Sequence, residues 1–175
     1  MMRFFKARSV VPALLAAAWL CPGTSAQNYV HRDSHWKIDF PAGWILTERS
    51  PRGAVCTAPV GLARLVVAKK RSGAKSPRAF LAEAGPSDLR RYGAARRTLQ
   101  SDVVVRGHRG LRVEYDYADP ILRRPMKAWR TILLENGIAN VITFEASAED
   151  YGATQSRAEG ALRSFLPSFD PAGAQ

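Results

Sequence analysis

The chain has 175 residues, with 26 lysines and arginines against 15 aspartates and glutamates, and a formal net charge of +11 with histidine neutral. This length is enough to bury one hydrophobic core. Because Cys21 lies in a predicted leader, Cys56 would be the only cysteine of the mature chain, which excludes an internal disulfide and leaves stability to packing.

Residues 1–26 have the pattern of a signal peptide. Basic residues precede an apolar run over 10–20, and small residues at Thr24 and Ala26 fit a cleavage site. The apolar run is shorter than the roughly 20 residues that a membrane-spanning helix needs. The sequence therefore predicts cleavage after Ala26, a periplasmic or secreted location, and no transmembrane segment in the mature chain.

The remaining charge limits the class of partner. Removing the leader's Arg3, Lys6 and Arg8 lowers the formal charge from +11 to +8. On an exported protein, such a surface favours an anionic envelope component or a membrane-associated protein complex, and no nucleic acid partner is expected. The simpler alternative is an arginine-rich surface that only contacts water.

The mature chain is expected to contain one domain. Residues 27–34 are polar and lack periodicity, so they are expected to form a flexible N-terminal arm. A single domain is expected over residues 35–169, followed by a C-terminal tail over 170–175.

The domain opens with a strand, a turn and a second strand. Trp36, Ile38 and Phe40 alternate with polar residues, so their side chains are expected to share one face. Proline and glycine at 41–43 predict a turn, and a second strand is expected over 44–49.

Further short strands and one helix are expected next. A third strand runs through Cys56, and a fourth covers 62–69, where aliphatic and β-branched residues are frequent. Ser76 as N-cap and Pro77 as first helical residue predict a helix, which is expected to end at Gly85-Pro86.

Two hairpins are expected in the second half. Strands over 95–106 and 111–117 are joined by a Gly107–Gly110 turn. The second of these strands predicts a sheet that is wet on one side, because Leu111, Val113, Tyr115 and Tyr117 alternate with Arg112, Glu114 and Asp116. Strands over 126–134 and 138–146 flank Asn136-Gly137, a strong hairpin signal.

The last element is predicted to be helical. Ser147 and Asp150 fit a capping box, and Pro167 marks the end of the helical pattern. The side chains expected to dock on the sheet are spaced as one helical face: Ala158, Ala161, Leu162 and Phe165.

Three stretches together resemble the PsbP-like family, which includes the photosystem II extrinsic protein PsbP and bacterial DcrB-like relatives. They are Lys37–Trp44 (KIDFPAGW), Arg112–Tyr115 (RVEY) and Arg163–Phe165 (RSF). The resemblance implies an α+β fold in which helices flank an antiparallel sheet, an α/β/α sandwich. It also implies a protein that assists or binds rather than catalyses, although one fold serves many tasks.

Motifs for chemistry are few. His31, Asp33 and His35 lie too far apart along an extended strand for both histidines to bind one ion. Glu114 and Asp116 are expected to form ion pairs with Arg112 on the wet face. A calcium site from Asp116, Asp119, Glu149 and Asp150 and a Cys56–His108 dyad are weaker hypotheses. No catalytic residue, metal site or cofactor is therefore predicted.

Two sets of residues are singled out for other roles. Basic groups at turns and strand ends are candidates for binding an anion or partner: Arg106, His108, Arg109, Arg123, Arg124 and Lys127. The predicted core comprises Trp36, Ile38, Phe40, Trp44, Val113, Tyr115 and Phe165.

Three functions remain open from the sequence. The first is an exported, non-catalytic PsbP-like accessory protein that docks on an envelope or membrane-associated complex. The second is a small envelope hydrolase or metal-dependent enzyme, which requires a pocket with perturbed acids or a tight metal. The third is a lipid- or effector-binding chaperone-like module, which requires an exposed apolar patch.

Overall fold

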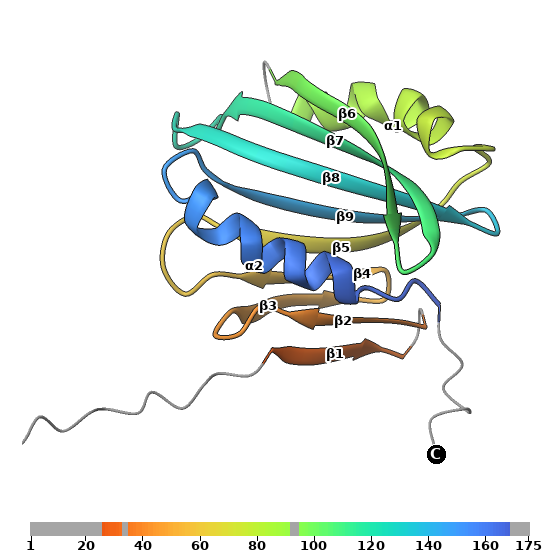
Figure 1. Ribbon diagram of the computed structural model, residues 1–175. Coiled ribbons are helices and arrows are strands. Elements are labelled where there is room, and N and C mark those ends of the chain that lie inside the picture. Colours follow the sequence, from red (N-terminus) through yellow and green to blue (C-terminus); the bar gives the residue numbers. More distant parts are fainter. Residues whose placement is uncertain (1–25, 33–34, 92–94, 169–175) are drawn as a thin grey trace, which may run out of the picture.

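A large antiparallel sheet, strongly twisted, carries one helix on each face (Figure 1). The computed structural model describes residues 26–32, 35–91 and 95–168. In these residues the sheet has 7 strands, in the order β3-β4-β5-β9-β8-β7-β6. Its strands are β3 (Ile45–Ser50), β4 (Gly53–Thr57), β5 (Arg64–Arg71), β6 (Arg96–Val105), β7 (His108–Ala118), β8 (Pro125–Glu135) and β9 (Ile138–Ser147).

The central strands β8 and β9 are covered on both sides. Trp129 and Phe144 face α2 (Tyr151–Ser164), whereas Ile132 and Val141 face α1 (Pro77–Arg91). This double coverage explains why β9 is apolar along most of its length instead of alternating. All seven residues of the predicted core are buried: Trp36, Ile38, Phe40, Trp44, Val113, Tyr115 and Phe165.

The N-terminal segment differs from the expected flexible arm. Residues Gln27–His31 form β1, which pairs antiparallel with β2 (Trp36–Phe40) in a separate two-stranded sheet. The His31 ring stacks on Trp36 with 5.0 Å between centroids, and its Nε2 atom lies 2.7 Å from the carbonyl oxygen of Ser50. These contacts order a polar segment whose own sequence has no strand signal.

The predicted turn at 41–43 connects two different sheets. Trp44 donates its amide to the carbonyl of Pro41 at 3.1 Å, and Gly43 adopts a positive φ of 76°. The chain thereby leaves the small sheet at Phe40 and enters the edge of the large sheet at Ile45.

The first helix is longer than expected. Ser76 caps it as predicted, since its Oγ accepts the amide of Ala79 at 3.1 Å. The helix does not end at Gly85-Pro86 but continues to Arg91. A proline removes only one amide donor, so the turns on either side can keep the chain helical.

Both predicted hairpins are present, and both are tight. Asn136 and Gly137 form a two-residue turn with φ of 47° and 73°. The earlier hairpin closes at Arg106 and Gly107, with φ of 49° and 87°, so β7 begins at His108 and the turn is shorter than expected.

Ser147 and Asp150 bond to each other before α2 but do not form the predicted capping box, because Asp150 is itself the N-cap residue and makes no side-chain cap hydrogen bond. Ser147 Oγ accepts the amide of Asp150 at 3.0 Å and donates to its carboxylate at 2.7 Å. The whole of the predicted tail, residues 170–175, and all of the predicted leader except Ala26 lie outside the described residues. No helix of the described part is long and apolar enough to cross a membrane.

Candidate functional site

The six basic residues singled out from the sequence lie at opposite ends of the sheet. Arg106, His108 and Arg109 lie at the start of β7, whereas Arg123, Arg124 and Lys127 follow its end. Since β7 has 11 residues, the two groups are roughly 33 Å apart. We call these the hairpin end, closed by the turns at 106–107 and 136–137, and the loop end, which comprises the loops at 58–63, 119–124 and 148–150.

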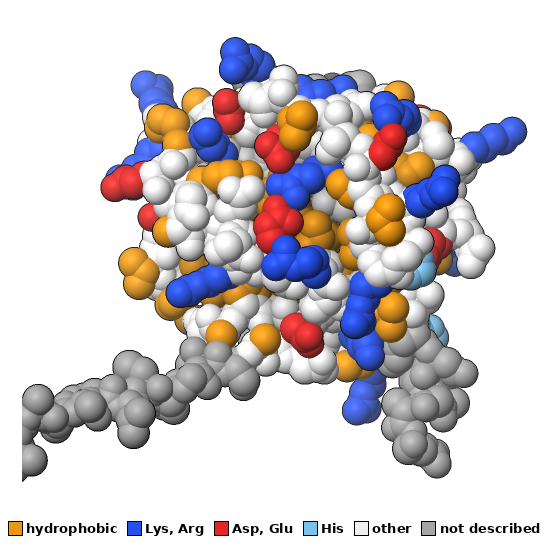
Figure 2. Space-filling model, viewed as in Figure 1, with side chains coloured by type: hydrophobic (Ala, Val, Ile, Leu, Met, Phe, Trp, Pro, Cys, Tyr) orange, Lys and Arg blue, Asp and Glu red, His pale blue; other side chains and the backbone are white. Residues whose placement is uncertain are grey.

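The loop end exposes large apolar side chains. Ile121 is 86% exposed, Leu122 is 51% exposed, and Val60 on the neighbouring β4–β5 loop is 84% exposed. Apolar, basic and acidic side chains are visible along the left edge of Figure 2, where Figure 1 places these loops. Exposed apolar side chains that gather on one surface make it a candidate for an interaction site.

A single carboxylate organises residues 119–124, which we call the docking loop. Asp119 Oδ1 accepts the amides of Ile121 and Leu122 at 2.9 and 2.7 Å. The backbone of Asp119 also accepts from Arg123 at 2.8 Å and donates to Arg124 at 2.9 Å. The exposed apolar pair is thus held by a local scaffold rather than by burial.

Hydrogen bonds join the three loops into one surface. Asp150 accepts the amide of Leu62 at 3.2 Å, which ties the β4–β5 loop to the start of α2. Ala148 donates to the carbonyl of Pro125 at 2.9 Å, which ties the same segment to the first residue of β8, directly after the docking loop. Gly61 permits this approach, because a Cβ there would lie 2.6 Å from the Asp150 carboxylate.

The carboxyl of Asp150 is held in its charged form. Its pKa lies below the ordinary value of 3.8, first because Ser147 donates to it, then because the Leu62 amide does, with a smaller contribution from Arg124. The Asp150 carboxylate therefore serves to hold the loops together, and the positive charge of Arg124 helps to keep it ionised.

At the hairpin end, the cations are less available as a set. His108 Nδ1 contacts the carboxylate of Glu135, so this predicted site residue faces an acid. Lys69 lies nearby on β5 and donates to the carbonyl of Pro167 at 2.8 Å. Burial lowers the pKa of Lys69 below 10.5, and Glu135 opposes that shift. Arg106 and Arg109 are exposed.

The expected wet face of β7 is partly covered by α2. Arg112 Nε donates to Glu114 at 3.0 Å, and its guanidinium also donates to Glu159 of α2 at 2.5 Å. The Arg112 guanidinium carbon lies 4.8 Å from the centre of the Trp129 ring, with only 13% of the side chain exposed. The predicted pairing of Glu114 with Arg112 is present, and this charged cluster anchors the helix.

Sequence reasoning missed a buried acidic group on the opposite face. Glu145 is 2% exposed, pairs with Arg64 across the β5–β9 ladder and accepts a hydrogen bond from Tyr117 at 3.0 Å. Its carboxylate is satisfied by these two partners, which fits a structural role. The signal in the sequence was a glutamate between two apolar residues, Phe144 and Ala146, in a strand that contains no other charged residue.

The weaker chemical hypotheses gain no support from geometry. His31 is committed to Trp36 and Ser50, and Asp33 lies outside the described residues. Cys56 is buried in the middle of β4, and burial raises its pKa to about 11. Among the residues that the structure describes, no group of three or more His, Cys, Asp or Glu side chains is arranged to hold a metal.

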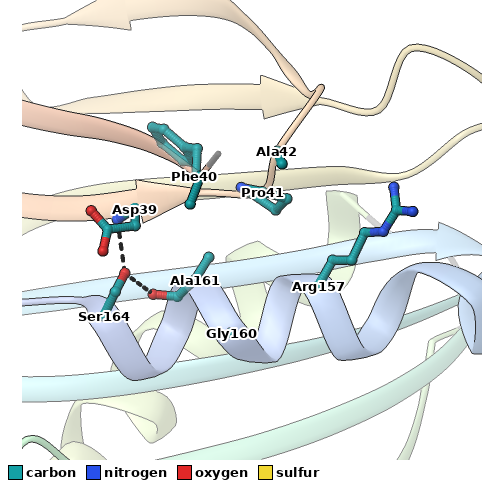
Figure 3. A pocket seen from close by; sticks show the side chains of 9 residues that line it. Asp39, Phe40, Pro41, Ala42, Arg157, Gly160, Ala161 and Ser164 are labelled. Atoms are coloured by element: carbon teal, nitrogen blue, oxygen red, sulfur yellow. Dashed lines mark hydrogen bonds between the residues drawn. The ribbon is translucent and has the colours of Figure 1, made fainter. Parts of the chain in front are cut away.

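A shallow groove of about 440 Å³ lies between β2 and α2 (Figure 3). Phe40, Pro41 and Ala161 line it, and Arg157 extends along its rim. At one end, Ser164 Oγ accepts the amide of Asp39 at 2.7 Å and donates to the carbonyl of Ala161. The first and last of the three family-like stretches therefore meet here, which explains them as fold contacts.

The same fold occurs in bacterial proteins of solved structure. The cyanobacterial PsbP of Synechocystis aligns with a TM-score of 0.57 at 15% identity, over 87% of this chain and 98% of its own. LpqN of Mycobacterium tuberculosis, described as involved in cell envelope biogenesis, aligns with a TM-score of 0.57 at 16% identity, over 79% of this chain and 88% of its own.

A protein from Bacteroides thetaiotaomicron aligns with a TM-score of 0.60 at 11% identity over 85% of this chain, which spans 50% of that protein's length. No model of a known protein family and no curated protein sequence matches the chain. At these identities the likeness establishes the fold, and the predicted α+β, PsbP-like architecture is confirmed.

Proposed function

We propose that this protein is an exported, non-catalytic accessory protein that docks on an envelope or membrane-associated complex through its loop end. The observation that carries the proposal is the docking loop, which holds Ile121 and Leu122 in water next to Arg123 and Arg124. Exposed apolar side chains with a cationic border are a typical docking surface.

The fold supports the same class of function. LpqN, which shares the fold, is described as involved in cell envelope biogenesis, and PsbP-like proteins are accessory proteins in the resemblance drawn from the sequence. Glu114 is engaged in a structural contact with Arg112, and the buried Glu145 is engaged in one with Arg64. These observations favour a binding role over the hydrolase hypothesis.

Site-specific photo-crosslinking in the native envelope tests the proposal. A photoreactive residue replaces Leu122, and a matched control places the same residue at Val104, which is 68% exposed near the hairpin end. The expected result is a discrete set of envelope adducts from position 122 that position 104 does not give. Identical adducts from both positions, or none from either, would contradict docking through the loop end.

A further inference from the structure

We propose that the docking loop binds directly to an anionic lipid surface, with Ile121 and Leu122 entering the head-group boundary while Arg123 and Arg124 contact lipid phosphates. This inference rests on the proposed function, because it names the component on which the loop end docks. Such binding requires an exposed apolar tip, cationic side chains beside it, and an exposed surface that can lie against a flat bilayer.

The apolar tip is present and protrudes. All of residues 120–125 are exposed, and Ile121 keeps 86% of its surface in water. Leaving two branched aliphatic side chains in water forgoes the stabilisation that their burial would give. Transfer of both into the acyl boundary of a bilayer recovers that stabilisation in the bound state.

The charges next to the tip favour an anionic surface. Between Pro120 and Pro125 the chain carries Arg123 and Arg124 and no acid. Arginine presents a planar donor set that suits phosphate oxygens. Lys127, also exposed, adds a third cation at the start of β8, and its Nζ lies 5.9 Å from the centre of the Tyr151 ring.

Acids at the loop end oppose this attraction, and hydrogen bonds hold two of them in the scaffold. Asp119 turns its carboxylate to the amides of Ile121 and Leu122, and Asp150 turns its own to Ser147 and the Leu62 amide. The other acids of this end are Asp116, paired in register with Lys127, and Glu149, in the β9–α2 connection. All four acids lie outside residues 120–125, so the charged side chains of the tip itself are arginines.

The scaffold reduces the cost of binding. Four backbone amides of the loop region are bonded through Asp119, and the positive φ of 51° at Arg123 fixes the reversal of the chain. A loop that is already ordered loses little conformational freedom when it binds. The bound geometry is thus close to the geometry of the free protein.

The small size of the exposed tip favours a bilayer over a protein partner. A stable protein interface needs about 800 Å² on each partner, whereas the docking loop alone is a short tip. Val60 projects from the β4–β5 loop roughly 14 Å away, as judged from three strand spacings in the sheet order. Two separated apolar tips on one end can contact the same flat lipid surface.

Vesicle sedimentation tests the inference. The chain from Gln27 onward, which contains every described helix and strand, is mixed with phosphatidylcholine vesicles with or without phosphatidylglycerol. Omitting the leader matters because its apolar run would itself enter lipid. Binding is expected only with phosphatidylglycerol, and Arg123→Gln with Arg124→Gln should weaken it roughly 30-fold, at about 1 kcal/mol for each charge near the surface.

Matched variants separate specific insertion from general charge attraction. Arg106→Gln with Arg109→Gln removes the same charge from the hairpin end and should change binding less than about threefold. Ile121→Ser with Leu122→Ser should weaken binding at least about tenfold, while Val104→Ser leaves it unchanged. Equal losses from the two arginine pairs would overturn the inference in favour of diffuse electrostatics.

An environment-sensitive dye provides a second readout, which reports whether a given position enters the lipid rather than how tightly the protein binds. The buried Cys56 thiol, whose pKa is raised to about 11 by burial, reacts slowly, so Leu122→Cys can be labelled selectively. A blue shift with anionic vesicles at position 122, and none for Val104→Cys, is expected.

The outcomes distinguish this inference from the proposed function. If vesicles fail to bind wild type but the envelope still gives protein adducts from position 122, the lipid inference is wrong and docking on a protein stands. If neither vesicles nor envelope components are bound through the loop, both are wrong. Vesicle binding with loss in the loop variants supports both.

Discussion

The loop end and the hairpin end lie at opposite ends of the same sheet. The backbone conformation of their connections decides which side chains each end can expose. At the hairpin end, two-residue turns place Arg106, Gly107, Asn136 and Gly137 at positive φ. Large branched side chains are disfavoured in that conformation. At the loop end, the longer connection at 119–124 has room for a side-chain scaffold and carries Ile121 and Leu122 outward.

This difference shows that charge alone does not identify the functional surface. Both ends carry exposed arginines, Arg106 and Arg109 at one and Arg123 and Arg124 at the other. Only at the loop end do the arginines flank an exposed apolar pair held by hydrogen bonds to Asp119. The combination of apolar exposure with local order, rather than the count of cations, distinguishes the two ends.

The largest expected effect comes from removing the aromatic support below the loop end. Trp44 is 4% exposed and its ring lies 6.5 Å from that of Phe144. Trp44→Ala should lower the free energy of unfolding by about 3–5 kcal/mol, because a large cavity would remain in the core. Chemical denaturation measures this change; an unaltered midpoint would mean that the loop end does not depend on this core.

A smaller effect is expected at the hairpin end, where strands approach closely. A Cβ at Gly110 would lie 2.4 Å from Leu133 Cδ2 and 2.6 Å from the carbonyl oxygen of Ile132. Gly110→Ala should cost about 1–3 kcal/mol through overpacking. Gly152→Ala, where the added Cβ meets no atom within 4 Å, is the matched control; equal behaviour of the two variants in thermal unfolding would refute close packing at Gly110.

Loss of the loop scaffold should affect local order more than global stability. Asp119→Ala removes the acceptor for the amides of Ile121 and Leu122, at a cost of about 0.5–1.5 kcal/mol. Hydrogen exchange at these two amides should accelerate, and docking should weaken. Asp102→Ala, which removes an exposed partner of Arg78 near the hairpin end, should leave that exchange unchanged; protected loop amides in Asp119→Ala would show that the carboxylate is not the scaffold.

The smallest effect at neutral pH is expected for Asp150→Asn, since asparagine can still accept the Leu62 amide. The difference should depend on pH. Because the folded pKa of Asp150 is lowered by Ser147, the Leu62 amide and Arg124, its charged form stabilises the fold above the ordinary pKa of 3.8, and that contribution is lost as pH falls through the folded value. Thermal unfolding of both proteins at neutral and acid pH should show their difference shrinking in acid; a constant or growing difference would contradict this assignment.

Local sequence patterns were sufficient to predict most elements of the fold. Alternation identified β7, Asn136-Gly137 identified the β8–β9 hairpin, and Ser147 with Asp150 identified the start of α2. Each of these signals depends on neighbouring residues, so it can be read without tertiary information. The resemblance to PsbP-like proteins supplied the layered arrangement, which periodicity alone does not specify.

The same patterns did not predict structural features that depend on contacts with residues elsewhere in the chain. Gln27–His31 become a strand because Trp36 and Ser50 contact His31, and the acidic Glu145 is tolerated because Arg64 and Tyr117 satisfy it. Ser50 lies 19 residues from His31, and Arg64 and Tyr117 lie 81 and 28 residues from Glu145, so a reading along the chain cannot assign these contacts. Trp36 is near His31 in sequence, but their contact depends on the pairing of β1 with β2.

The sequence by itself determined which residue types meet water, which segments alternate and where the chain reverses, because these properties follow from local chemistry. It also identified the basic residues that border the proposed docking surface. Only the tertiary structure separated them into two ends and placed Ile121 and Leu122 on a loop ordered by Asp119. Strand order sets the two ends, and it depends on pairings between residues far apart along the chain, such as those of β5 with β9. The hydrogen bonds of Asp119 are local, but they form only in the loop conformation that the sequence pattern did not indicate.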